Sequence, residues 1–232
     1  MGLGDLGSYS LSDFLLFSDR VYWRMFARYN EAMWPAQAGT IAAGVLMLLG
    51  LMKPGRWAAR LTLAALSVLW MLVAWLFFFE RYQTINWAAV FIALPFAFQA
   101  GLLAMLAAQR APLIPAIQRR AGDFLVAAIF VFAVAGWPVI ALFAARDWQS
   151  AEVFGIAPDP TAVATLAVAA LMPMSARWLA MAVPLAWCFA SGLTLYVLGA
   201  AEWFVAPALG IAAASASVGR MAPAGAINRP AA

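Results

Sequence analysis

Two consecutive apolar runs in residues 61–108 constrain this chain more than any other feature. Residues 61–79 form a stretch of 19 without a charge, and residues 88–108 form another of 21. The polar segment 80–87 joins them. At about 1.5 Å of rise per residue, about 20 apolar residues in a helix cross the roughly 30 Å hydrocarbon layer of a bilayer. The two runs therefore predict a membrane-spanning helical hairpin with a polar turn at one surface.

The composition extends this prediction to the whole chain. Of 232 residues, 66% are hydrophobic and only 10% are charged, whereas soluble domains contain about 25% charged residues. The net charge of +4 comes from basic residues that lie between apolar runs, which indicates membrane topology rather than a nucleic-acid partner. We therefore predict an all-α integral membrane helical bundle embedded in a lipid bilayer, with no nucleic acid bound.

Three regions are predicted along the sequence. Residues 1–31 form an N-terminal segment, residues 32–219 form a bundle of about seven transmembrane helices, and residues 220–232 form a disordered cytoplasmic tail. The predicted spans are 32–52, 57–79, 88–108, 124–145, 160–174, 178–198 and 203–219. The fifth and sixth are the least regular, because residues 161–201 contain Arg177 as their only charge and are long for one crossing but short for two.

The N-terminal segment has the periodicity of an amphipathic helix that begins after Ser10 or Ser12 and ends near Met33. Arginines recur every fourth residue on one side, at Arg20, Arg24 and Arg28. The apolar side contains Leu11, Phe14, Leu15, Tyr22, Met25, Phe26 and Tyr29. This pattern is typical of a helix in the membrane interface. It is equally compatible with a helix that packs on the bundle as a lid.

The charges on the connections predict the orientation, because basic residues are enriched on the cytoplasmic side. One predicted side carries nine basic residues and one acid: Lys53, Arg56, Arg60, Arg110, Arg119, Arg120, Arg177, Arg220, Arg229 and Asp123. The other carries nine acids and five basic residues, Arg20, Arg24, Arg28, Arg81 and Arg146. We therefore expect the N-terminus outside and the C-terminus in the cytoplasm.

Polar residues that could form a site collect at the predicted outer ends of the helices. They are Glu80, Arg81, Tyr82, Asn86, Trp87, Asp159, Thr161, Thr165, Ser191, Thr194 and Glu202. If these ends converge, they form a shallow outward cup for a small polar solute or for a loop of a partner. In the alternative interpretation, Glu80 and Arg81 pair locally, while Asp159 and Glu202 stabilise helix starts.

Several classes of function are disfavoured. No centre of a predicted span contains an Asp, Glu, Lys, Arg or His, although ion-coupled transporters and proton relays usually need one there. The chain has no histidine and one cysteine, Cys188, in an apolar run, so we expect no metal site, no cofactor and an inert thiol. Phosphate-binding, GxSxG, HExxH and dinucleotide motifs are absent, which disfavours an enzyme.

Five stretches carry a resemblance to a known family. They are LSDFLLFS at 11–18, WPAQ at 34–37, ERYQTINWAA at 80–89, GIAPDPTAVAT at 155–165, and WC at 187–188 followed by SG at 191–192. With these stretches the chain resembles a family of bacterial multi-pass membrane proteins known only as a domain of unknown function. The resemblance extends over nearly the whole chain. It implies a bacterial membrane location and gives no catalytic residues.

Two functions remain open. The first is a non-catalytic accessory or interaction component of the bacterial inner membrane, which works through helix packing with a membrane-protein partner or a second copy of the chain. The second is a small facilitator or permease for a weakly polar solute, with its site at the extracytoplasmic face. An intramembrane enzyme is the least favoured, because the residues offer no nucleophile–base pair.

The predicted orientation can be tested with reporter fusions at Gly55 and Ala111. Both positions lie in connections rich in basic residues, so both fusions should report a cytoplasmic location. A fusion at Gln83, in the turn of the hairpin, should report an external one. An external signal at Gly55 or Ala111 would contradict the orientation.

Overall fold

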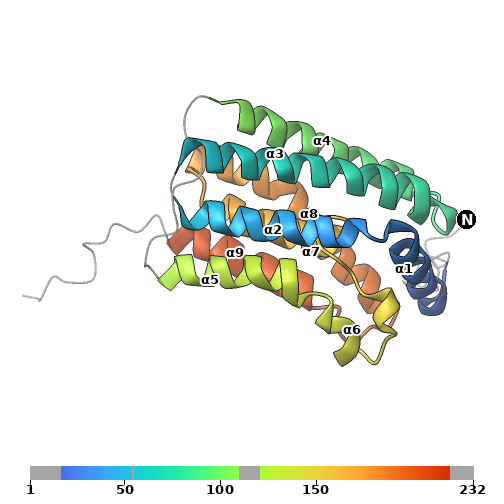
Figure 1. Cartoon of the computed structure of the whole chain (residues 1–232). Helices are drawn as coiled ribbons and strands as arrows, with labels where there is room; N and C mark the ends of the chain where they lie inside the picture. Colours follow the sequence, from blue (N-terminus) through green and yellow to red (C-terminus); the bar gives the residue numbers. More distant parts are fainter. Residues whose placement is uncertain (1–16, 54, 110–120, 220–232) are drawn as a thin grey trace, which may run out of the picture.

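The computed structural model describes residues 17–53, 55–109 and 121–219 and contains an all-α bundle (Figure 1). Within these residues there is no β-strand, only an isolated bridge between Phe154 and Ala157. The helices are α1 (Asp19–Met33), α2 (Ala36–Met52), α3 (Arg56–Leu72), α4 (Ala89–Ala108), α5 (Ala121–Val131), α6 (Val139–Phe143), α7 (Pro158–Ala170), α8 (Met174–Val197) and α9 (Val205–Gly219). The predicted all-α fold is confirmed.

The described helices include fewer clear membrane spans than the sequence predicts. Three are long and apolar enough to cross a bilayer, at Arg56–Thr84, Ala89–Ala108 and Met174–Val197. The pair α1 and α2 gives a fourth if it counts as one span, although the two axes differ by 85°. Two further apolar helices, Gly122–Gly136 and Val205–Val218, are shorter. By length and composition, the described residues thus provide three or four candidate spans. The seven crossings expected from the sequence stay a prediction.

The predicted hairpin is α3 and α4 packed side by side (Figure 1). α3 continues without a break into the π-helical segment η3 (Val73–Arg81), and the 3₁₀ turn η4 (Tyr82–Thr84) follows. The Arg60 guanidinium donates to the carbonyls of Ala107 and Ala108 at the end of α4, both at 3.1 Å. It therefore satisfies two acceptors that lack a partner within the helix.

The outward side of α4 is apolar and exposed. Phe91, Leu94, Phe98 and Met105 each have between 61% and 64% of their surface exposed, while Phe96 and Leu103 on the inward side are buried. A helix that is apolar on all sides is typical of a core or a membrane span. Among the described residues, α4 therefore presents an uncovered apolar side.

Helix α1 is turned across one end of the bundle (Figure 1). It begins at Asp19, because the Ser18 hydroxyl accepts from the Val21 amide as an N-cap. The start predicted at Ser10 or Ser12 lies outside the described residues, as do Leu11, Phe14 and Leu15 on the predicted apolar side. The rest of that side is buried as predicted, at Tyr22, Met25, Phe26 and Tyr29. α1 therefore packs on the bundle as a lid.

Two predicted spans have irregular structure. The predicted span 124–145 is divided, since α5 passes into a π-helical segment, η5 (Phe132–Gly136), and α6 begins only after Pro138. A proline within a helix removes a backbone donor and favours such a break. The predicted span 160–174 corresponds to α7, which has 13 residues. Between them, the 3₁₀ turn η6 (Trp148–Ser150) leads into residues 151–157, which are not helical.

Helix α7 lies at the centre of the fold. All 13 of its residues are buried, and it packs against α3, α5, α8 and α9. Its alanines, valines and threonines are small, which lets the surrounding helices approach closely. Pro158 and Pro160 occupy its first turn, where a missing amide hydrogen removes no helical bond.

The segment before α7 is buried although it is not helical, and its backbone groups have side-chain partners. The Tyr29 hydroxyl donates to the backbone carbonyl of Ile156 at 3.1 Å, and the side-chain amide of Asn30 donates to the backbone carbonyl of Ala151 at 2.7 Å. The amide of Gly155 donates to the Thr161 hydroxyl at 2.9 Å. α1 and α7 thus hold the segment from both sides, because buried backbone groups need hydrogen-bond partners.

Replacing Gly155 with alanine should destabilise the protein. Gly155 has φ +83°, and an added Cβ would lie 2.7 Å from Cβ of Thr40 and 3.0 Å from a methyl group of Leu69. We expect a loss of about 1–3 kcal/mol, measured as a lower melting temperature in detergent. Gly101→Ala is the matched control, because an added Cβ there meets nothing within 4 Å and alanine favours a helix. Equal melting temperatures for both variants would contradict the packing described here.

Candidate functional site

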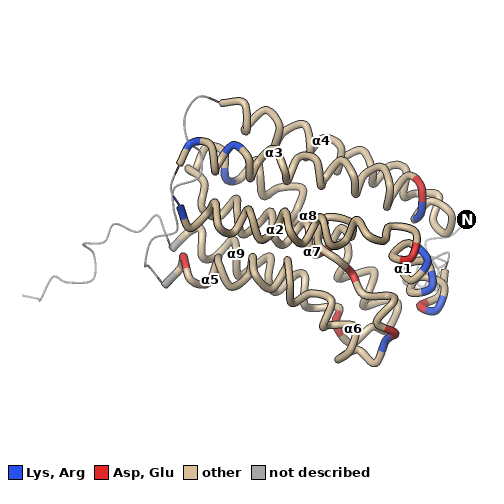
Figure 2. The backbone as a smooth tube through the Cα atoms, in the orientation of Figure 1, with Lys and Arg blue, Asp and Glu red and all other residues tan. Residues whose placement is uncertain are grey.

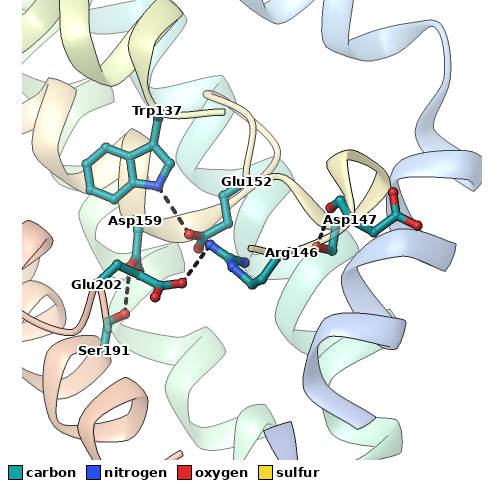
Figure 3. A network of polar contacts seen from close by, with 8 residues as sticks. Trp137, Arg146, Asp147, Glu152, Asp159, Ser191 and Glu202 are labelled. Carbon is teal, nitrogen blue, oxygen red and sulfur yellow. Dashed lines mark hydrogen bonds and ion pairs between the residues drawn. The ribbon is translucent and has the colours of Figure 1, made fainter. Parts of the chain in front are cut away.

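Four charged residues whose side chains are buried or nearly so lie near one another toward the end of the bundle that carries α1 (Figure 3). They are Arg146 and Glu152 in the connection from α6 to α7, Asp159 in the first turn of α7, and Glu202 just before α9. We call these four residues the carboxylate cluster. It is the largest group of buried ionisable side chains in the described ranges.

Asp159 is 2% exposed and accepts two hydrogen bonds from α8. The Trp187 indole donates to Oδ1 at 2.7 Å, and the Ser191 hydroxyl donates to Oδ2 at 2.6 Å. Both distances are short, as is typical of bonds to an ionised acceptor. The start of α7 also favours a negative charge, because the free amides of a first turn point toward it. The sequence predicted Asp159 and Ser191 as members of one site, and their side chains do meet.

Glu152 is 5% exposed and accepts one hydrogen bond, from the Trp137 indole at 3.1 Å. Burial raises the pKa of Glu152 to about 8, and the negative charge of Asp159 adds to this. Arg146 and the bond from Trp137 act in the opposite direction but do not compensate. Glu152 therefore keeps its proton at neutral pH, which is unusual for a carboxylic acid.

Arg146 and Glu202 form the only ion pair within the described residues. Nη2 of Arg146 lies 2.8 Å from Oε1 of Glu202, and the two side chains are 10% and 9% exposed. The guanidinium also lies over the Trp23 ring of α1, 3.4 Å from its centroid. Its Nε and Nη1 atoms have no hydrogen-bond partner, and the contact with Glu202 is close without being aligned as a hydrogen bond. Arg146 thus joins α1 to the start of α9.

The cluster contains more negative than positive groups. Three buried carboxyl groups lie around a single guanidinium, and burying an uncompensated charge is costly. Holding a proton lowers this cost, which agrees with the raised pKa of Glu152. Tyr22 of α1, Tyr82 of η4 and Cys188 of α8 also face these charges. The arrangement can therefore take up and release protons. Among the residues that the structure describes, no three acidic or cysteine side chains converge as a metal site.

The other predicted site residues lie apart from the cluster. Thr161 and Thr165 donate to carbonyls within or just before α7, and Thr165 also accepts from the Trp70 indole at 2.8 Å. Thr194 donates to the carbonyl of Ala190. Asn86 accepts from the amide of Ala88 in the hairpin turn. These four polar side chains thus serve the local structure of their own segments.

The hairpin turn does not join the cluster either. Tyr82 is buried among aromatic rings, and Glu80, Arg81 and Trp87 are exposed. In the described part of the chain, no ion pair joins Glu80 to Arg81, and no hydrogen bond or ion pair joins Glu80 to Asp159 or Glu202. The predicted single cup therefore divides into a buried part around Asp159 and an exposed part at the turn.

Four residues of the site were not predicted from the sequence. Arg146 and Glu152 lie in a connection that was predicted on the outer side but not as part of a site, and Trp137 and Trp187 were not assigned to a site. One signal was available for Glu152, since residues 151–157 around it are otherwise apolar or small. Such a composition is typical of a buried segment rather than a surface loop.

A family model matches residues 19–225, and its description is a family of unknown function, DUF6064. The chain belongs to this family. The match includes every residue of the carboxylate cluster, and the resemblance to a family of unknown function is thereby confirmed. No curated protein and no solved structure matches the chain.

The stability of this DUF6064 protein should fall as the pH rises from about 4.5 to about 8. Glu152 has a raised pKa of about 8 in the folded chain and an ordinary value of 4.5. In this window the unfolded chain releases the proton while the folded chain keeps it, so rising pH favours unfolding. Glu152→Gln removes this titrating group and should reduce the dependence of the melting temperature on pH. Glu80→Gln changes an exposed carboxylate and should keep the wild-type slope, whereas an unchanged slope in Glu152→Gln would contradict the assignment.

Proposed function

We propose that this chain is a multi-pass integral membrane protein of the bacterial inner membrane, with the carboxylate cluster toward the extracytoplasmic side. Three long apolar helices and the exposed apolar side of α4 support this. The charge distribution agrees, since basic residues dominate one end of the described bundle, while acidic and basic residues mix at the end with α1 (Figure 2). In this proposal the shorter helices complete about seven crossings, and the N-terminus lies outside.

We infer further that the protein is a small facilitator for a weakly polar solute. The observation that carries this inference is the break before α7. With 13 residues, α7 is about 20 Å long, less than the roughly 30 Å of the hydrocarbon layer. The largely buried, non-helical residues 151–157 precede α7 and extend this path toward the outer surface. Irregular backbone at such a depth is tolerated only when it is buried in protein or lines a cavity.

The position of the polar groups agrees with this inference. Broken helices in transporters present their N-terminal ends to a binding site, and Asp159 occupies such an end in α7. Glu152 lies within the break, and Asp159 lies just after it, in the first turn of α7. When one of these two carboxyl groups takes up a proton, the charge at the break changes. This change can control which solutes the site accepts. The sequence argument against buried ionisable groups assumed that Asp159 lies at the surface, whereas it is 2% exposed.

The accessory role is the second candidate, and one observation favours it. The carboxylates of Glu152 and Asp159 are bound by Trp137, Trp187 and Ser191 of the chain itself. In this role the cluster holds α1 and the connection from α6 to α7 against the core of the bundle. The outer surface of these segments can then contact a membrane-protein partner or a second copy of the chain. No solute would then pass.

A transport assay separates the two roles. Purified protein is reconstituted in liposomes, and stopped-flow light scattering follows the entry of glycerol and of methylammonium as a neutral and a cationic probe. We expect the wild type to exceed protein-free liposomes for at least one probe, and Asp159→Asn to lower the rate about tenfold or more, because two hydrogen bonds and a charge change at the break.

The control for this assay is Glu80→Gln, which alters an exposed carboxylate in the hairpin turn and should leave the rate unchanged. Wild-type rates equal to those of protein-free liposomes for both probes would contradict the facilitator. In that case, isolation of a stable complex with another membrane protein in mild detergent would support the accessory role.

A further inference from the structure

A second group of charges lines a pocket between α1 and the hairpin turn. The pocket has a volume of about 370 Å³. Arg24 and Arg28 of α1 line it together with Arg81 at the end of η3. Val21, Met25 and Ile85 contribute apolar walls. We call this the arginine pocket, and it is separate from the carboxylate cluster, since none of its lining residues belongs to that cluster.

The three arginines have no acidic partner among the residues that the structure describes. Arg24 and Arg28 are four residues apart and therefore lie on the same face of α1, and Arg81 faces the same pocket. All three are exposed. Within the described residues, no hydrogen bond or ion pair joins any of them to a carboxylate. Three like charges around one pocket repel one another, so an anion bound between them would lower the energy of this arrangement.

The chemistry of the lining indicates the type of anion. A guanidinium offers several donors in a planar fork, which suits the oxygens of a phosphate group. The apolar walls formed by Val21, Met25 and Ile85 suit hydrocarbon rather than water. A ligand that matches both properties has a phosphate at one end and an alkyl chain at the other. The volume is within the range of about 300–1,000 Å³ that is common for small-molecule sites.

We infer that the arginine pocket binds the phosphate headgroup of an anionic phospholipid. This inference rests on the proposed membrane location. It also accounts for the arginines of α1, which oppose the otherwise acidic balance predicted for their side of the membrane. An interfacial helix with basic residues on its polar face binds anionic lipid in the same way.

The test compares two lipids and one free anion. Purified protein is stripped of lipid in an uncharged detergent and titrated with phosphatidylglycerol, with phosphatidylcholine or with inorganic phosphate, while the melting temperature is recorded. Phosphatidylglycerol should raise the melting temperature in a saturable manner, and phosphatidylcholine should not. Equal effects of both lipids would overturn the proposal. An effect of inorganic phosphate that equals that of phosphatidylglycerol would assign the pocket to a free anion instead of a lipid.

Variants localise the effect. Arg24→Gln, Arg28→Gln and Arg81→Gln should each weaken the apparent affinity for phosphatidylglycerol about tenfold, because each removes a charged donor. Arg20→Gln is the matched control, since Arg20 is exposed on the same helix but does not line the pocket. An equal loss in Arg20→Gln would overturn the site in favour of diffuse attraction. Arg81→Lys, which keeps the charge, should retain part of the affinity.

These experiments test the arginine pocket and the proposed membrane location separately. The four arginines are exposed, so the variants should melt like the wild type without lipid, and this measurement excludes misfolding as the cause of any loss. A protein that stays in solution without detergent would contradict the proposed membrane location. A protein that needs detergent and keeps its lipid affinity in all three pocket variants would contradict only the arginine pocket.

Discussion

The burial of α7 constrains the rest of the structure. A helix with no exposed residue must have partners on every side, and α3, α5, α8 and α9 provide them. Its ends must also find hydrogen bonds inside protein rather than in water. At its start Asp159 is held by Trp187 and Ser191. Buried charged side chains therefore lie at both ends of this central helix, Asp159 at its start and Arg177 near its end.

Different kinds of side chain form the hydrogen bonds at the two ends of α7. At the C-terminal end, the guanidinium of Arg177, which is 5% exposed, donates twice to the carbonyl of Met172 and once to that of Ser217. The donor there is a single cation and the acceptors are neutral carbonyl groups, so these hydrogen bonds do not depend on the protonation of an acid. At the N-terminal end, three carboxyl groups lie around Arg146. Glu152 at this end has a pKa raised to about 8 by burial, so its charge can change near neutral pH, which is why we place the function there.

Features that depend on local pattern could be predicted from the sequence. The uncharged runs in residues 61–108 gave the hairpin of α3 and α4, and the spacing of Tyr22, Met25, Phe26 and Tyr29 identified the buried side of α1. Their signals arise from helical periodicity and from the absence of charge, and both can be read in a short window. The same reasoning identified Asp159 and Ser191, because they lie at span ends on the same predicted side.

Features that depend on contacts between distant segments could not be predicted. Glu152 meets Trp137, Arg146 meets Glu202 and lies over Trp23, and no periodicity links these positions. The burial of residues 151–157 was also not predicted, because a non-helical connection is normally exposed. Here Tyr29 and Asn30 of α1 satisfy its backbone. A loop can be buried only when another element supplies its hydrogen bonds, and a sequence window does not contain that element.

Helix α1 connects the two groups of charge at this end of the bundle. On its inward side, the Trp23 ring lies under Arg146, and the Tyr29 hydroxyl donates to a backbone carbonyl of the buried segment. On its outward side, Arg24 and Arg28 line the arginine pocket together with Arg81. A force on one side of a rigid helix is transmitted to the other, since packed helices shift as units. The position of α1 on the bundle therefore affects both the partner of Arg146 and the shape of the arginine pocket. A lipid bound in the pocket would hold α1 against the bundle and so stabilise the cover of the carboxylate cluster.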